Sequence, residues 1–230
     1  MTTEKAPEMC EFGTREAALV DAAPGPGQLE GAQAPVSLRL KRLTDIVGAI
    51  LLTIFLMPLL VATTVAVKSS SPGPVIFTQM RTGRGGAPFR IWKFRTMHVM
   101  EDAGEVVQAE RNDTRLTPIG GFLRRTSIDE LPQLINVIKG DMSLVGPRPH
   151  AIAHDEQFSQ VAPDYYLRFR MRPGITGLAQ ISGHRGSIVS TEQIIARVAC
   201  DNAYIDDWSL KTDLKILVKT VLGVPFHRAF

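Results

Sequence analysis

An uninterrupted apolar run near the N-terminus constrains this chain more than any other feature. Residues 46–67 of the 230-residue sequence contain no charged side chain. A helix needs about 20 apolar residues to match the hydrocarbon core of a bilayer. The run begins too far along the chain for a signal peptide and lacks a small-residue cleavage site. We therefore predict a membrane segment over residues 37–68, preceded by a tail over 1–36 and followed by one domain over 69–230.

Two features of this run bear on whether it spans a membrane or turns back: its proline and its flanking charges. Pro58 lies near the middle of the run, and proline in a helix removes one hydrogen bond and produces a kink. Basic side chains flank both ends, with Arg39, Lys41 and Arg42 before the run and Lys68 after it. The positive-inside bias therefore does not choose a side for the second flank. The residues alone leave a spanning helix and a re-entrant helix about equally open.

The tail and the rest of the chain differ in charge and pattern. Residues 1–36 are rich in alanine, glycine, proline and acidic side chains without an apolar period, which is typical of disorder. The whole chain carries a net charge of +3, so the part after this acidic tail is distinctly basic. A basic membrane protein can meet anionic lipid, nucleic acid or phosphorylated substrates.

After the apolar run, the pattern predicts an α+β fold with a small β-hairpin and a mostly helical cytosolic domain. Two β-prone runs over 75–79 and 88–95 flank a glycine-rich turn and predict the hairpin. A helix is predicted over 127–140, because apolar side chains recur there at helical spacing. Ser127 can cap this helix and Gly140 can end it. An irregular stretch is expected to follow.

Three further segments complete the expected elements: a short helix and loop over 100–117, and helices over 191–207 and 209–223. The last helix is amphipathic, with Lys211, Lys215 and Lys219 beside an apolar stripe of leucine and valine. That pattern suits a helix lying in the headgroup plane of a membrane. It also suits a helix packed on a soluble core with its lysines in water. The upstream membrane run favours the interfacial placement.

The adjacent acids Asp129 and Glu130 are the main candidates for chemistry. Their structural alternative is a capping box, in which Ser127 and Glu130 stabilise the start of a helix. The surrounding bases favour chemistry, because they lie among turns and apolar residues, and arginine forks suit phosphate oxygens. These bases are Lys93, Arg95, Arg124, Arg125, Arg148, Arg170 and Arg172.

Such a pair could transfer a phosphoryl group. One carboxylate can attack phosphorus to form an acyl phosphate, which splits a hard transfer into two steps. A second carboxylate can hold Mg²⁺, which prefers oxygen ligands and neutralises phosphate oxygens. Arginines would stabilise the charge on the equatorial oxygens. From the residues alone, a purely structural ion-pair cluster is the alternative.

Eight motifs follow one another along the chain from about Leu40 to its end. They are Lys41–Asp45, Pro74–Gly83, Trp92–Met97, Ser127–Gln133, Asn136–Pro149, Arg172–Gln180, Asp201–Tyr204 and Trp208–Leu214. In this order they resemble the bacterial sugar transferases, also called monotopic phosphoglycosyl transferases. The family often has Ser-Pro at its helix break, where this chain has Met57-Pro58.

The resemblance implies a re-entrant helix broken at Pro58 and a catalytic domain, over 69–230, on the cytoplasmic face of the bacterial inner membrane. It implies that Asp129 attacks a UDP-sugar, releases UMP and passes the phosphosugar to polyprenyl (undecaprenyl) phosphate. Glu130, together with Asp129, would bind Mg²⁺. With Arg95 added from the basic surroundings, the expected substrate- and phosphate-binding side chains are Lys93, Arg95, Arg124, Arg148, Arg172 and Asp201.

The C-terminal motifs narrow the expected substrate class. Ser182–Gly186 and Trp208–Leu210 look like those of relatives that start exopolysaccharide repeat units with glucose or galactose, and they do not separate these hexoses. A homo-oligomer stays open. A non-catalytic membrane adaptor is one rival. A nucleic-acid-binding membrane protein is another, and we expect no nucleic-acid partner because the bases lie among Gly-Pro turns rather than along a recognition helix.

Overall fold

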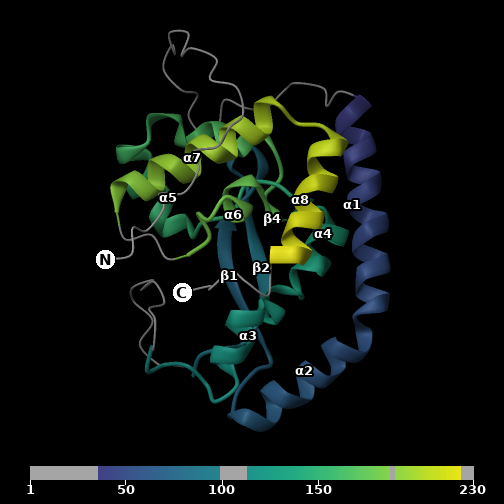
Figure 1. Cartoon of the computed structure of the whole chain (residues 1–230). Helices are drawn as coiled ribbons and strands as arrows, with labels where there is room; N and C mark the ends of the chain where they lie inside the picture. The colour runs from purple at the N-terminus through teal and green to yellow at the C-terminus, as the bar shows by residue number, and fades with distance from the viewer. Residues whose placement is uncertain (1–35, 99–112, 187–189, 224–230) are drawn as a thin grey trace, which may run out of the picture.

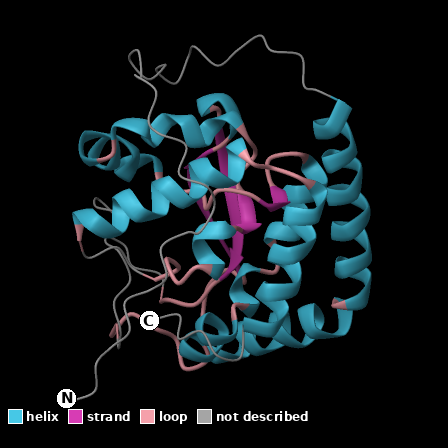
Figure 2. Ribbon diagram, turned by 45° about the horizontal axis from the view of Figure 1, so that its top comes forward, coloured by secondary structure: helices cyan, strands magenta, loops and turns pink. Residues whose placement is uncertain are grey.

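The computed structural model describes residues 36–98, 113–186 and 190–223 (Figure 1). Residues 1–35 of the predicted disordered tail and most of the predicted helix and loop over 100–117 lie outside these described residues, whereas Val36 already belongs to the first helix. The described elements are mixed helix with two small sheets, an α+β arrangement as the sequence predicted. Figure 2 shows the strands surrounded by helices.

The apolar run folds as two helices that meet at a sharp bend. Helix α1 (Val36–Phe55) and helix α2 (Met57–Ser70) are separated by Leu56 and inclined by 64°. Pro58 lies in the first turn of α2, where its missing N–H is tolerated. Among the described helices none is long and apolar enough alone to cross a bilayer, whereas this bent pair qualifies by length and composition. The predicted break at Pro58 is therefore confirmed.

The predicted hairpin is also confirmed. Strand β1 (Ile76–Thr82) pairs antiparallel with strand β2 (Pro88–Phe94), in a register that places Ile76 opposite Phe94. The short 3₁₀ turn η1 (Arg84–Gly86) closes the hairpin, with positive φ at Gly85 and Gly86. Glycine accepts this conformation at no steric cost, so the turn follows from the sequence.

The segment around the acidic pair differs from the prediction. Helix α3 (Gly120–Thr126) ends at Ser127, a 3₁₀ turn η2 (Ile128–Glu130) follows, and helix α4 (Gln133–Lys139) starts only after Pro132. The expected continuous helix over 127–140 and its Ser127 cap are wrong, because Pro132 has no N–H for a bond to the preceding turn. Gly140 ends α4 in the left-handed conformation, as predicted.

The stretch after Gly140 is not irregular, contrary to the prediction. It holds two three-residue parallel strands, two helices and a 3₁₀ segment. These are β3 (Ser143–Val145), α5 (Ile152–Val161), η3 (Pro163–Arg170), β4 (Gly174–Thr176) and α6 (Leu178–Ile181). The two helices predicted near the end are present as α7 (Thr191–Asp206) and α8 (Leu210–Gly223).

Close backbone contact brings the two proline-rich motifs together. Gly146 follows β3, and Gly174 and Gly177 bound β4. A Cβ on Gly177 would lie 2.2 Å from the Gly146 carbonyl oxygen, and one on Gly174 would lie 2.1 Å from the Gly146 nitrogen. The three glycines are therefore needed for backbones to touch, and this contact fixes the loop that follows Gly146.

The main core joins helix α1 to the rest of the fold. Ala49 of α1 is buried with Val137 of α4, Met142, Leu144 of β3 and Ile216 of α8. In Figure 1, α1 runs along the side of the domain beside α4 and α8, while α2 turns away beneath α3. Helix α1 is thus part of the core, which fixes its position relative to α4.

Candidate active site

The acidic pair lies in the short turn between α3 and α4. Asp129 and Glu130 belong to η2 and are each 7% exposed. The chain enters η2 through Ser127, whose φ of 59° is the sole positive value of a non-glycine residue within the described residues. Its amide nitrogen donates to the Arg124 carbonyl oxygen, 3.2 Å away. This turn redirects the chain, so that η2 packs on β2.

Two cations hold Glu130. The Lys93 ammonium donates to its Oε1 over 2.7 Å, and the Arg148 guanidinium donates to Oε1 over 2.8 Å and to Oε2 over 3.3 Å. Burial alone would raise the pKa of Glu130, but the charges of Arg148 and Lys93 outweigh burial and hold that pKa well below its usual range. Glu130 is therefore ionised at any physiological pH.

Asp129 has a different environment. Its carboxylate accepts no hydrogen bond from the residues that the structure describes, although Lys93, Arg124 and Arg148 lie near enough to act on it electrostatically. Burial, followed by the charge of Glu130, raises the pKa of Asp129 to about 6. Asp129 is therefore mostly ionised at neutral pH but has its oxygens available. A raised pKa also makes it the stronger nucleophile of the two acids.

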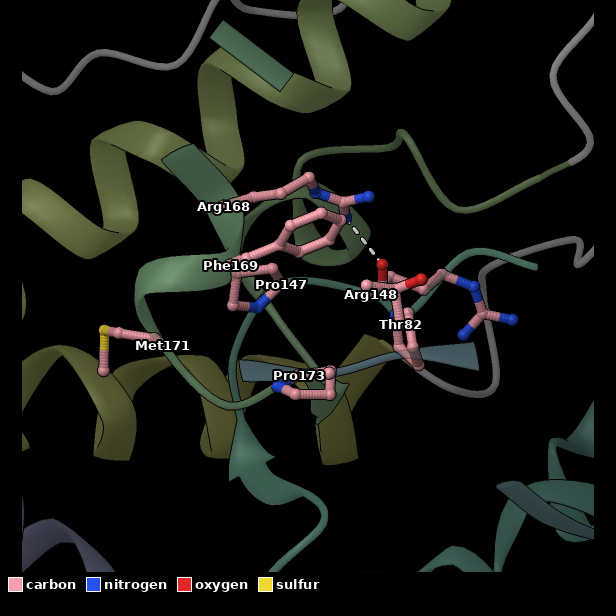
Figure 3. A pocket seen from close by; sticks show the side chains of 9 residues that line it. Thr82, Pro147, Arg148, Arg168, Phe169, Met171 and Pro173 are labelled. Carbon is pink, nitrogen blue, oxygen red and sulfur yellow. Dashed lines mark hydrogen bonds between the residues drawn. The ribbon is translucent and has the colours of Figure 1, made fainter. Parts of the chain in front are cut away.

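The backbone of Arg148 is held in place by a buried arginine, Arg168. The Arg168 guanidinium is 2% exposed, and it donates to the Arg148 carbonyl oxygen and to Asp201 Oδ2, each over 2.6 Å. Figure 3 shows the bond to the Arg148 backbone, with the Arg148 side chain pointing away from Arg168. Asp201 thus reaches the site indirectly, because it positions Arg168 and through it the backbone of Arg148.

A buried polar network extends from Arg168. Its Nη1 donates to His150 Nδ1 over 2.6 Å, and the Tyr165 hydroxyl donates to Asp155 Oδ1 over 2.6 Å. Burial, and then the charge of Arg168, keeps the pKa of His150 well below its usual range, so His150 is neutral. Thr82, at the end of β1, also donates to Asp155. The network therefore ties the hairpin to the loop that carries Arg148.

The predicted substrate-binding residues fall into two groups. Lys93 and Arg148 contact Glu130, and Asp201 acts through Arg168, as described above. Arg124 donates from Nε to Thr96 Oγ1 over 2.9 Å; burial lowers the pKa of Arg124, and the nearby charge of Asp129 opposes that shift. These four side chains surround or support the acidic pair.

Arg95 and Arg172 lie elsewhere. Arg95 is 3% exposed and donates to the carbonyl oxygens of Ser71 and Pro72, so it fastens the end of α2 to β2. Arg172 donates from Nε to the Gly140 carbonyl oxygen over 2.9 Å. The structure does not bring either guanidinium to the acidic pair.

Sequence reasoning missed Arg185. Its guanidinium donates to the Ser127 hydroxyl, two residues before Asp129, and the charges of Glu130 and Asp129 act on it. Burial lowers the pKa of Arg185. The available signal was a base between two glycines, Gly183 and Gly186, in a turn like those around Arg148. Arg185 is thus a further cation facing the site.

The donor set is compatible with Mg²⁺. Across the described ranges, no group of three or more histidine, cysteine, aspartate or glutamate side chains is arranged to hold a metal. Mg²⁺ commonly needs only one or two protein carboxylates and takes its other ligands from water and substrate phosphates. Asp129, with free oxygens, and Glu130, whose Oε2 has only the 3.3 Å contact from Arg148, meet that requirement.

Comparison with known proteins gives the family. A sequence model described as bacterial sugar transferase matches residues 36–227. A UDP-glucose:undecaprenyl-phosphate glucose-1-phosphate transferase of Caulobacter vibrioides is 55% identical over 186 residues, which cover 81% of this chain and 69% of that protein. The protein of the same name from Escherichia coli is 53% identical over 186 residues, and the match covers 81% of this chain but 40% of that protein.

A third relative has nearly the same length as the matched part. The exopolysaccharide production protein PSS of Rhizobium leguminosarum is 42% identical over 192 residues, which cover 82% of this chain and 96% of that protein. The matched ranges include η2, β2 and the Arg148 loop. The chain therefore belongs to the bacterial sugar transferase family, as its ordered motifs predicted.

Proposed function

We propose that this enzyme transfers glucose 1-phosphate from UDP-glucose to undecaprenyl phosphate and so begins the assembly of an exopolysaccharide. The names of the Caulobacter and Escherichia relatives support both substrates, and the Rhizobium relative supports the pathway. Glucose is preferred to galactose on those names alone. The observation that carries the chemistry is the contrast within the acidic pair: Glu130 is paired with Lys93 and Arg148, whereas Asp129 is buried with its oxygens available.

The proposed reaction has two balanced steps. An Asp129 carboxylate oxygen attacks the phosphorus that carries the sugar, the bond from this phosphorus to the bridging oxygen breaks, and UMP leaves with that oxygen. An oxygen of undecaprenyl phosphate then attacks the same phosphorus, the Asp129–phosphorus bond breaks, and undecaprenyl diphosphate glucose forms. Asp129 returns to a carboxylate, so the enzyme needs no further reactant.

The basic side chains would stabilise the negative charge of the substrate from different elements of the fold. Lys93 and Arg148 fix Glu130 and present positive charge to the substrate from β2 and from the loop after β3. Arg124 and Arg185 approach Asp129 from α3 and from the turn after α6. Burial excludes part of the water that would otherwise screen these charges, so they act more strongly on phosphate oxygens. Mg²⁺, held by Glu130 and Asp129, would neutralise diphosphate oxygens of the bound substrate.

The bent helix pair supports a membrane location with re-entrant topology. Bases flank both ends of the apolar run, and α8 exposes Leu214, Val218 and Val221, with exposed fractions of 63%, 49% and 74%. Such side chains are costly to leave in water and suit the acyl boundary. In the proposed topology α1 enters from the cytoplasmic face of the inner membrane and α2 returns to it. Epitope tags at both chain ends should then be protected from protease added to spheroplasts; a digested N-terminal tag with a protected C-terminal tag would instead indicate a spanning helix.

Trapping the covalent intermediate tests the chemistry. Detergent-solubilised protein is incubated with UDP-glucose and Mg²⁺ in the absence of a lipid acceptor, and intact mass and released UMP are measured. We expect a mass increase of one hexose phosphate, in equal amount to the UMP. Asp129→Asn should show neither signal. The matched control Asp141→Asn changes a half-buried aspartate just beyond α4 and should keep both.

The possible outcomes distinguish an error in the proposed mechanism from an error in the proposed site. Release of UMP only after undecaprenyl phosphate is added, with no adduct in any condition, would support direct transfer and refute the covalent step. Full activity of Asp129→Asn would refute the site itself and favour a purely structural ion-pair role for the acids. A parallel incubation with UDP-galactose measures the choice of hexose.

A further inference from the structure

A second basic pocket lies at the base of α1, apart from the acidic pair. It encloses about 290 Å³ of empty space, partly open to solvent. The first turns of α1, the hairpin turn η1 and the segment between η3 and β4 line it. None of Lys93, Arg124, Arg148, Asp129 and Glu130 is among its lining residues. Much of this space is open solvent, so the pocket suits a small polar group bound at the surface rather than an enclosed nucleotide sugar.

Three guanidinium groups converge on this pocket without an acidic partner. They belong to Arg42 of α1, Arg84 of η1 and Arg172. Burial lowers the pKa of Arg172, and the charges of Arg42 and Arg84 lower it further. Three like charges in one half-buried pocket repel one another, which costs folding free energy. A bound anion would offset this repulsion.

The contacts of these arginines leave donors available. Arg42 donates to the Val137 and Ile138 carbonyl oxygens over 2.6 and 3.0 Å, and Arg172 uses Nε for Gly140. The Arg84 side chain makes no hydrogen bond or ion pair with any residue in the described ranges. The terminal nitrogens of Arg172 likewise have no partner there.

The other charged residues around the pocket are already engaged. Lys41 pairs with Asp213 over 2.7 Å, and Arg170 pairs with Asp206 over 2.6 Å. Asp45, the single acid of the lining, accepts from Ser143 Oγ over 2.8 Å and from the Leu144 nitrogen over 3.0 Å. The pocket therefore keeps an excess of positive charge.

We propose that Arg42, Arg84 and Arg172 form a second phosphate-binding site, which takes the phosphate of an anionic lipid headgroup or phosphate free in solution. Arginine forks match phosphate oxygens, and three of them supply the charge that a phosphate diester or monoester needs. The charge-free run starts at residue 46, one residue beyond Asp45. A lipid headgroup would therefore lie at the depth of this pocket. That lipid source rests on the proposed membrane location, whereas the phosphate chemistry does not.

The test counts bound phosphate rather than turnover, so a failure of the proposed sugar transfer does not affect it. The full chain is reconstituted in nanodiscs that contain phosphatidylglycerol and phosphatidylcholine, and the lipid retained by the protein is counted by native mass spectrometry. A parallel arm measures the shift in Tm of the delipidated protein with inorganic phosphate. The variant is Arg84→Ala, chosen because Arg84 has no bond to lose. The control is Arg90→Ala, which removes an exposed arginine from the same hairpin.

Arg84→Ala should retain at least about tenfold less phosphatidylglycerol than the wild type, since one charge-assisted hydrogen bond is worth roughly 1.5–3 kcal/mol and about 1.4 kcal/mol corresponds to tenfold. Arg90→Ala should match the wild type. A loss confined to the lipid arm identifies the headgroup as the ligand, and a loss confined to the phosphate arm identifies free phosphate. If neither arm changes in Arg84→Ala, or if Arg90→Ala loses as much, the site does not exist.

Discussion

The two adjacent acids should respond to neutralisation with opposite changes in stability. The pKa of Asp129 rises from 3.8 to about 6 on folding, mainly through burial. One pKa unit corresponds to about 1.4 kcal/mol, so the ionised carboxylate costs roughly 3 kcal/mol of folding free energy. Asp129→Asn has the shape of the neutral acid and removes this cost. Glu130→Gln leaves Lys93 and Arg148 without a partner, which costs roughly 3–5 kcal/mol for buried pairs.

The direction of the pKa shift of Asp129 determines how its contribution to stability changes with pH. Because the folded pKa of Asp129 lies above its unfolded value, the folded state binds this proton more tightly. The contribution of Asp129 to stability is therefore fully present below pH 3.8 and is lost as pH rises through about 6. Asp129→Asn lacks this loss, so the two proteins should differ at pH 8 and converge near pH 4.

Thermal unfolding in detergent, followed by intrinsic fluorescence at pH 4 and at pH 8, measures these differences. For a chain of this size, 1 kcal/mol shifts Tm by about 2–4 °C, so Asp129→Asn should melt roughly 6–12 °C above the wild type at pH 8. Glu130→Gln should melt below the wild type at the same pH. An Asp129→Asn variant that melts at or below the wild type at pH 8 would refute the view of Asp129 as an uncompensated buried charge.

Three further predictions concern catalysis and folding. The rate of adduct formation should rise with pH through about 6 and be about tenfold lower at pH 5 than at pH 8, as single-turnover UMP release would show, because only ionised Asp129 attacks. Asp201→Asn should lower stability by roughly 3–5 kcal/mol in denaturant titrations, since it leaves the buried Arg168 unpaired; an unchanged midpoint would show that this ion pair is dispensable. Gly146→Ala should reduce the yield of folded protein on size-exclusion chromatography, because a Cβ there would lie 2.4 Å from the Arg172 carbonyl oxygen; a normal elution profile would show that the two loops can separate.

Features with a local cause could be predicted from the sequence. Pro58 breaks the helix of the apolar run because proline lacks an N–H wherever it stands. The hairpin follows from two β-prone runs around glycines, and Gly140 ends α4 because glycine accepts a positive φ. Asp129 and Glu130 stood out because a known set of motifs surrounds them.

Features that depend on contacts distant in sequence could not be predicted. Strands β3 and β4 are three residues long, too short to show a period of two, and their pairing depends on glycine contacts between distant segments. Helix α5 buries Phe158 and Asp155 rather than a regular apolar stripe. The sequence contexts of Arg148 and Arg172 are alike, each beside proline, so only tertiary structure separates the arginine at Glu130 from the arginine at Gly140.

The anchoring of α1 to the domain has a consequence for how the enzyme handles a lipid substrate. Lys41, Arg42 and Asp45 bind α8, α4 and β3 respectively, while Gly48 lets Leu144 approach within 2.8 Å of where a Cβ would stand. The helix is therefore a packed part of the fold and not a flexible tether. Removing it would expose one side of the core instead of releasing a soluble enzyme. Because α4 begins shortly after η2, this packing also fixes the position of Asp129 relative to α1 and, in the proposed topology, its height above the lipid. In the proposed reaction the long-chain acceptor would therefore have to bring its phosphate to that height, because α1 and the catalytic domain are packed as one unit.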